Sequence, residues 1–207
     1  MKLIKWTLVL FLIHASFLYA QDVEGSNQGN YKQGIKKERK EKDTEFKDSE
    51  KSPLSQDEIQ KFKGLRYFKP NQTYRVKAKL ILEEEPDTIL MKTTTERLPQ
   101  YIVYGKAYFT INDTNFSLTV YRNVGLMSKP GYEDYLFIPF TDETNGEETY
   151  GGGRYIDARI TPGDSIVIDF NRAYNPYCVY SKKYSCPIPP SENYIKARVA
   201  AGEKNYH

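Results

Sequence analysis

The sequence predicts a mainly β protein, an antiparallel barrel or sandwich of about eight strands with N-terminal helices packed on it. After Pro70 the hydrophobic residues recur with a period of two, which is typical of strands that bury one face. Glycine, proline and asparagine turns separate short segments of this kind, as expected for antiparallel sheets. About 187 residues remain after an N-terminal leader, a length that suits one domain with its own core.

The leader is a charged and then apolar segment at the N-terminus. Two lysines precede an apolar run over 6–18, and the small residue Ala20 follows. This pattern predicts a secretory signal peptide over residues 1–20, because the run is shorter than the roughly twenty residues that span a bilayer. We therefore expect an exported protein, periplasmic or extracellular, which meets the membrane only through this segment before cleavage. The alternative is an uncleaved anchor. Residues 21–30 are polar and are expected to be flexible.

Composition excludes several classes of function. Without Lys2 and Lys5 the 30 basic side chains become 28, against 27 acidic ones, so the remaining chain offers no electrostatic footprint for nucleic acid. His207, the last residue, is then the only histidine. Its position argues against histidine-dependent nucleophilic catalysis and against histidine-rich zinc sites. We expect no metal and no cofactor.

A helical segment is expected over 31–64, at the start of a single domain over 31–207. Tyr31, Ile35 and Phe46 fall on one side at helical spacing, as in a helix that lies on the domain surface. Ser55 stands three residues before Glu58 in a capping box, and Gly64 is a typical helix stop. These signals predict a second, short helix over 56–63.

The strands follow from alternating hydrophobicity between turn signals. A hairpin turn is expected over 112–115, between two of the longest candidates. The segments expected to be strands are 74–82, 88–95, 101–111, 116–122, 135–140, 154–160, 165–170 and 194–200.

Special residues are concentrated between Glu148 and Asn193, where we expect any functional site to lie. Successive backbone amides of Gly151, Gly152 and Gly153, just before Arg154, are a candidate cradle for an anion. The loop lacks the lysine and hydroxyl residue of a phosphate-binding loop. A tight turn that enters a strand is the alternative.

Candidate ligand contacts also stand at the end of the predicted 165–170 strand. Strand ends present functional side chains, and Asp169, Asn171 and Arg172 lie there. The alternative is a hydrogen-bonded corner that holds the next loop. Tyr155 and Tyr174 are candidate stacking partners for a sugar or planar ligand. Hydrolysis of a glycosidic bond would require two converging carboxylates, for which the candidates are Glu148, Asp157, Asp164 and Asp169.

Both cysteines, Cys178 and Cys186, belong to the same block. In an exported chain they predict a disulfide that closes a short loop and serves as a structural staple. Asn175 and Pro176 are expected to shape the backbone of that loop. Gly151, Gly152 and Gly153 are likewise expected to shape the backbone just before Arg154.

Five segments occur in a characteristic order: EFKDSEKSPL, FKGLRYF, ETYGGGRYIDA, IDFNRAYNPYC and CPIPPSEN. From about Phe46 to Lys204 the chain resembles the bacterial and archaeal domain-of-unknown-function family 1684. The resemblance implies a family without an established activity. By motif position it implies the signature residues Gly151, Gly153, Arg154, Tyr155, Asp169, Asn171, Arg172, Tyr174, Asn175 and Asn193.

These observations favour a non-enzymatic exported β-domain that binds a small polar or anionic ligand, or a partner in the cell envelope. A carboxylate-dependent hydrolase of glycosidase type is the second hypothesis. A purely structural envelope protein without a ligand pocket is the third.

Overall fold

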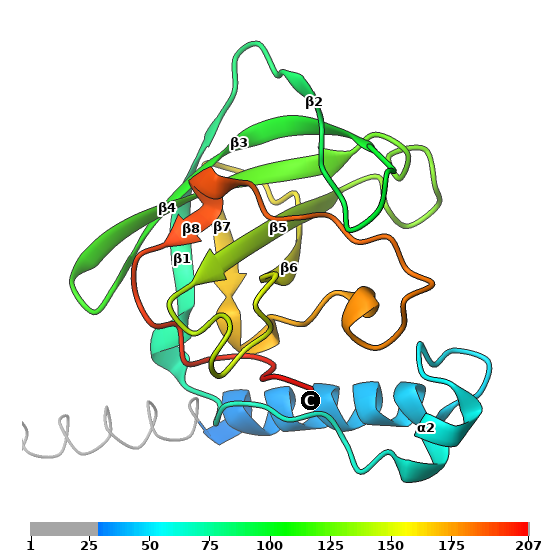
Figure 1. Cartoon of the computed structure of the whole chain (residues 1–207). Helices are drawn as coiled ribbons and strands as arrows, with labels where there is room; N and C mark the ends of the chain where they lie inside the picture. The colour runs from blue at the N-terminus through cyan, green and yellow to red at the C-terminus, as the bar shows by residue number, and fades with distance from the viewer. Residues whose placement is uncertain (1–28, 207) are drawn as a thin grey trace, which may run out of the picture.

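In the computed structural model, which describes residues 29–206, one sheet curls around a hydrophobic core and a long helix lies across one end (Figure 1). The strand order is β6-β5-β4-β3-β1-β7, with β2 added to β3 and β8 added to β5. Neighbours are antiparallel except for β5 and β8, which are parallel. The predicted mainly β fold is therefore confirmed, as a single curled sheet of eight strands.

All eight predicted strands are present, and two of them, the segments predicted at 88–95 and 194–200, are several residues shorter than expected. Residues beyond Leu90 leave β2, since Met91 bonds to Pro99 and Thr94 pairs with Cys186 instead. After Ile195 a tight turn, in which Ala197 N–H donates to the Ile195 carbonyl, ends β8. The strands are β1 (Arg75–Leu82), β2 (Thr88–Leu90), β3 (Gln100–Ile111), β4 (Thr114–Asn123), β5 (Tyr135–Asp142), β6 (Arg154–Arg159), β7 (Ser165–Asp169) and β8 (Tyr194–Ile195).

The two faces of the sheet carry different cores. One face encloses the main aliphatic and phenylalanine core, which includes Ile138, Phe140 and Ile156. The other face carries a smaller aromatic cluster, formed by Met91, Tyr101, Tyr121, Phe137 and Tyr155. Strand alternation produces this division, because neighbours along β5 and β6 point to opposite faces.

A β-bulge in β3 lets one strand serve both cores. The register with β4 shifts between Val103 and Gly105, where β3 contains one extra residue. After this residue, the side chains of β3 point to the opposite faces of the sheet from those expected without it. Tyr101 therefore belongs to the aromatic cluster, while Phe109 belongs to the main core. A Cβ atom at Gly105 would lie 2.4 Å from the Ile81 carbonyl oxygen, so only glycine fits at this close approach.

The N-terminal helix spans 29–47 and packs on the domain as its narrow apolar stripe predicts. Ile35 and Phe46 are almost fully buried. Helix α2 (Gln56–Lys61) begins at the predicted capping box and ends two residues early, because Phe62 is already extended. Gly64 then adopts a φ of +116°, which favours glycine. Four 3-10 turns complete the fold: η1 (Gln72–Tyr74), η2 (Phe170–Arg172), η3 (Tyr177–Val179) and η4 (Ser191–Asn193).

The capping box allows a test of how α2 is held. Ser55 Oγ accepts from the Glu58 amide, and the Glu58 carboxylate accepts from the Ser55 amide at 2.8 Å. Ser55→Ala is expected to lower the free energy of unfolding by about 1 kcal/mol, since it leaves a helix amide without its acceptor. Urea unfolding followed by circular dichroism measures the change. Ser49→Ala, at an exposed turn, is the control, and equal losses in both variants would contradict the capping role.

The predicted signal peptide at residues 1–20 lies outside the described residues, as does most of the 21–30 segment. Gly29 and Asn30 belong to the N-terminal helix. Between residues 29 and 206, none of the helices combines the length and hydrophobicity needed to cross a bilayer.

Candidate functional site

The structure separates the four polar residues that the sequence suggested as ligand contacts. Arg154, at the start of β6, is fully buried on the main-core side of the sheet. Its guanidinium donates to the Asp142 carboxylate at 2.6 Å and to the Val199 and Ala201 carbonyls. Arg154 therefore holds the C-terminal segment against the sheet and does not line either of the cavities described below.

Asp169, Asn171 and Arg172 meet in a different corner, where β7 ends in η2. Asp169 accepts from the Tyr31 hydroxyl at 2.9 Å and from Arg172 at 2.9 Å. Arg172 also donates to Glu38 of the N-terminal helix at 2.7 Å. The Asn171 side chain bonds to the Asn71 backbone through both its oxygen and its nitrogen. The contacts of Tyr31 and Glu38 dock the helix onto the sheet, and those of Asn171 hold the segment before β1.

Of the residues expected to shape the backbone, Gly153 and Asn175 are tightly packed. Gly153 has a φ of +90°, and a Cβ atom there would lie 2.7 Å from the Phe140 carbonyl oxygen. Asn175 is fully buried and donates to the Glu203 carboxylate and the Lys204 carbonyl. Pro176 lines the larger cavity. Gly151 and Gly152 are exposed.

The predicted disulfide is not formed, and both cysteines are free thiols. They nevertheless lie side by side, since the Cys178 amide donates to the Cys186 sulfur at 3.2 Å. The loop between them is held by other bonds: the Cys186 amide donates to the Thr94 hydroxyl at 3.1 Å. Backbone pairing of 186–188 with 92–94 therefore takes the role that sequence reasoning gave to a covalent staple.

The two thiols are expected to react differently. The Cys186 thiol, together with the Thr94 and Tyr150 hydroxyls, lowers the pKa of Cys178 by hydrogen bonding, whereas the same contact raises the pKa of Cys186. At pH 7 iodoacetamide is expected to modify Cys178 first, at a pH midpoint below the ordinary value of about 8.5. Mass spectrometry of quenched samples identifies the site. Equal rates at both cysteines, or faster modification of Cys186, would contradict this assignment.

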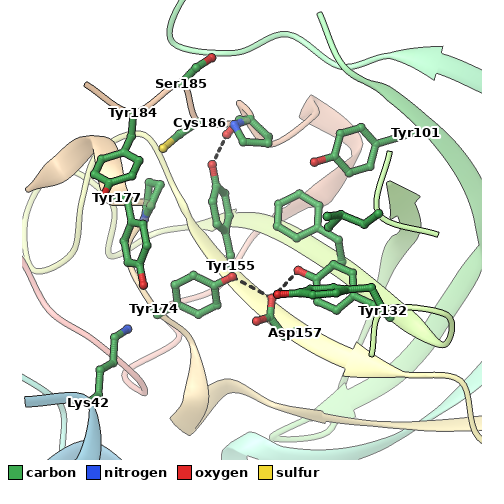
Figure 2. A pocket seen from close by; sticks show the side chains of 15 residues that line it. Lys42, Tyr101, Tyr132, Tyr155, Asp157, Tyr174, Tyr177, Tyr184, Ser185 and Cys186 are labelled. Carbon is green, nitrogen blue, oxygen red and sulfur yellow. Dashed lines mark hydrogen bonds between the residues drawn. The ribbon is translucent and has the colours of Figure 1, made fainter. Parts of the chain in front are cut away.

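A cavity of about 500 Å³ lies on the aromatic face of the sheet (Figure 2). Strands β3, β5 and β6 form one wall, the loop after η2 forms another, and the N-terminal helix contributes Lys42. Alternation along β6 brings Tyr155 and Asp157 to this face, while Arg154 and Ile156 turn to the opposite side. The lining is Lys42, Tyr101, Leu126, Tyr132, Tyr135, Phe137, Tyr155, Asp157, Tyr174, Pro176, Tyr177, Tyr184, Ser185, Cys186 and Pro187.

Asp157 is the only carboxylate among these lining residues. The hydroxyls of Tyr135 and Tyr174 both donate to its Oδ1 atom at 2.7 Å, as the dashed lines in Figure 2 show. Tyr155 is fixed separately by a hydrogen bond from its hydroxyl to the Pro187 carbonyl. Burial raises the pKa of Tyr135, Tyr155 and Tyr174, so these hydroxyls stay protonated at neutral pH.

A second cavity of about 250 Å³ lies between the sheet and the N-terminal helix and shares Lys42, Asp157 and Tyr174 with the first. The Lys42 ammonium lies 4.7 Å from the Tyr174 ring centroid and 3.3 Å from the Glu203 carboxylate. Asn171 and Arg172 line this smaller cavity. Lys42 is therefore a fixed cation at the junction of the two.

Of the six predicted ligand contacts, only Tyr155 and Tyr174 line the larger cavity, and Pro176 and Cys186, which were predicted in other roles, line it as well. Sequence reasoning missed Lys42, Tyr135 and Tyr184 as members of the site. It considered Asp157 only as one of four carboxylates. Alternation along the 154–160 strand was the signal that could have found Asp157. Because Ile156 points into the main core, its neighbours Tyr155 and Asp157 lie together on the opposite face. Among the described residues, no group of three or more histidine, cysteine, aspartate or glutamate side chains is placed to hold a metal ion.

Fold and cavity together define a small barrel-like β domain with a ligand-sized aromatic cavity beside its helix. The chain belongs to the family described as "Protein of unknown function (DUF1684)", whose model matches residues 60–204. The resemblance seen in the sequence motifs is thereby confirmed. An uncharacterized protein from Haloarcula marismortui, with a solution NMR structure, is 32% identical; the match covers 86% of this chain and 96% of that one, with a TM-score of 0.65. No curated protein matches the chain.

Proposed function

We propose that this protein is a binding domain that holds a small polar organic ligand in the aromatic cavity. The observation that supports it is a cavity of about 500 Å³ with predominantly aromatic walls and one hydrogen-bonded carboxylate. Ligand sites combine this size and apolar lining with a few fixed polar groups that orient the ligand. Tyrosine rings offer flat surfaces for stacking, and Asp157 offers an acceptor.

The cavity favours a polar ligand over the anionic one that the sequence also suggested. A carboxylate repels an anion, and Asp157 lies on the wall of both cavities. Arg154, the cation expected to attract an anion, is committed to Asp142. Export remains part of the proposal and rests on the pattern of residues 1–20.

The hydrolase hypothesis has less support. Of the four carboxylates considered, only Asp157 lines the larger cavity, and a glycosidase mechanism requires two acidic groups across the substrate. Ser185 lines it as well, but its hydroxyl contacts Thr93, Thr95 and Arg97, none of which is a general base.

Thermal-shift screening of the purified chain against amines, polyols, sugars and aromatic fragments tests the proposal. Leu126→Trp is designed to fill the cavity and is expected to abolish the shift caused by any hit. The matched control is Leu98→Trp, since Leu98 is half-exposed and lines neither cavity. Hits that stabilise Leu126→Trp as well as the parent would place binding elsewhere. The absence of any hit would favour the purely structural hypothesis.

A further inference from the structure

The charges inside the larger cavity are unbalanced. Lys42 and Asp157 are its only charged lining side chains. Lys42 already has a counter-ion, the Glu203 carboxylate at 3.3 Å. Asp157 forms no ion pair within 4 Å with any described residue, and its two hydrogen-bond donors are neutral tyrosine hydroxyls. Arg159 interacts with Asp157 electrostatically but forms its ion pair with Asp134, so the cavity presents a carboxylate that has no direct ion-pair partner.

The geometry leaves part of that carboxylate available. Both tyrosine hydroxyls donate to Oδ1, which fixes the orientation of the carboxylate, while Oδ2 receives no hydrogen bond from the described residues. Asp157 is exposed, so Oδ2 is not sealed inside the protein. Figure 2 shows Asp157 between Tyr174 and Tyr132, on the inner wall of the cavity. A ligand donor can reach it without breaking a contact of the folded chain.

Aromatic rings surround this carboxylate, and ring faces attract cations. The centroids of Tyr155 and Tyr174 are 5.7 Å apart with their planes at 89°, so they form a corner. Tyr132 and Tyr135 form a second corner, at 5.5 Å and 73°. The protein already places cations near two of these rings, because the Lys42 ammonium lies 4.7 Å from the Tyr174 centroid and the Arg159 guanidinium lies 5.9 Å from the Tyr135 centroid. Aromatic corners beside a carboxylate are the arrangement that binds alkylammonium groups.

We infer that the ligand of this cavity carries an alkylammonium or quaternary ammonium group, which lies against Asp157 and the tyrosine corners. The inference rests on the proposed function and names the chemical class of its ligand. It assigns Asp157 as the group that distinguishes a cation from an uncharged molecule of equal shape. Tyr135 and Tyr174 act as positioning residues for that carboxylate.

Isothermal titration calorimetry with shape-matched pairs tests the inference. One pair is choline and dimethylbutanol, in which carbon replaces the quaternary nitrogen; the other is phenethylamine and phenethyl alcohol. At least one cation is expected to bind about tenfold or more tightly than its uncharged partner. Asp157→Asn keeps an Oδ1 acceptor for both tyrosines and removes the charge, so it is expected to abolish this preference. Asp113→Asn, at the tip of the β3–β4 hairpin, removes the same charge outside the cavity and should leave the preference intact.

The outcomes separate this inference from the proposed function. Equal binding within each pair, or a preference that survives in Asp157→Asn, would overturn the cation assignment. If only uncharged or anionic compounds bind, and Leu126→Trp blocks them, the cation assignment fails while the binding function stands. If no compound of any class binds, both fail. An Asp157→Asn variant that melts like the parent confirms that lost binding is not lost folding.

Discussion

Replacing Arg154 by methionine is expected to lower the free energy of unfolding by about 3–5 kcal/mol, because it leaves a buried carboxylate without its counter-ion. Asp142 and Arg154 are both inaccessible to solvent, and the guanidinium also bonds to the Val199 and Ala201 carbonyls. Burial lowers the pKa of Arg154, and the attraction of Asp142 opposes that shift. Methionine retains the bulk of the side chain, so the loss reports mainly on charge and hydrogen bonding. Urea unfolding followed by circular dichroism gives the value.

Two further variants show whether the buried charge is the cause. Arg159→Met removes an arginine from the same strand, where it forms an exposed pair with Asp134, and is expected to leave the urea midpoint close to the parent value. The double variant Asp142→Asn with Arg154→Met should be more stable than Arg154→Met alone, because it no longer buries an unpaired charge. If Arg154→Met and Arg159→Met unfold at the same urea concentration, the ion pair is not a principal support of the fold.

Gly153→Ala is expected to be almost as damaging, at about 3 kcal/mol. Its φ of +90° costs an L residue roughly 1–2 kcal/mol, and overpacking adds about 1–3 kcal/mol. The new Cβ atom would lie 2.6 Å from Pro189 Cγ and 2.7 Å from the Phe140 carbonyl oxygen. Phe140 cannot move freely, since it pairs with Arg154 in the β5–β6 ladder. The midpoint of thermal or urea unfolding measures the effect.

Gly151→Ala provides the matched comparison within the same glycine run. An added Cβ at Gly151 has its nearest neighbour, Gly146 Cα, at 3.7 Å, and Gly151 does not require a left-handed backbone. This variant is expected to stay within about 0.5 kcal/mol of the parent. A loss of the same size in both variants would mean that flexibility of the whole run matters, and not the geometry of Gly153.

Local patterns were sufficient to predict most of the fold. Period-two alternation located every strand, and the capping box at Ser55 located α2, because both signals depend on residues close together in the chain. The register shift in β3 was not predictable in this way. It occurs where Gly105 closely approaches Ile81, a contact between strands that no local pattern encodes.

The site was predicted less completely, for a related reason. Glycines, arginines and asparagines drew attention to Arg154, Asp169 and Asn171, yet the structure uses these side chains in packing and docking. The larger cavity forms where distant segments meet, so Lys42 and Tyr135 join Asp157 only after folding. Tyr155 and Tyr174 were found because they belong to the same dense block of the sequence.

The contact between Lys42 and Glu203 ties the N-terminal helix to the C-terminal segment of the chain. The family model begins at residue 60, although the helix that carries Lys42 ends at residue 47. A protein shortened to the family boundaries would keep every strand but leave the Glu203 carboxylate buried without its ammonium partner. It would also lack the helix that contributes to the walls of both cavities. The apolar surface on which Phe46 packs would then be exposed to solvent. The boundary drawn by sequence similarity thus leaves out a helix that contributes to the buried core and to the walls of both cavities.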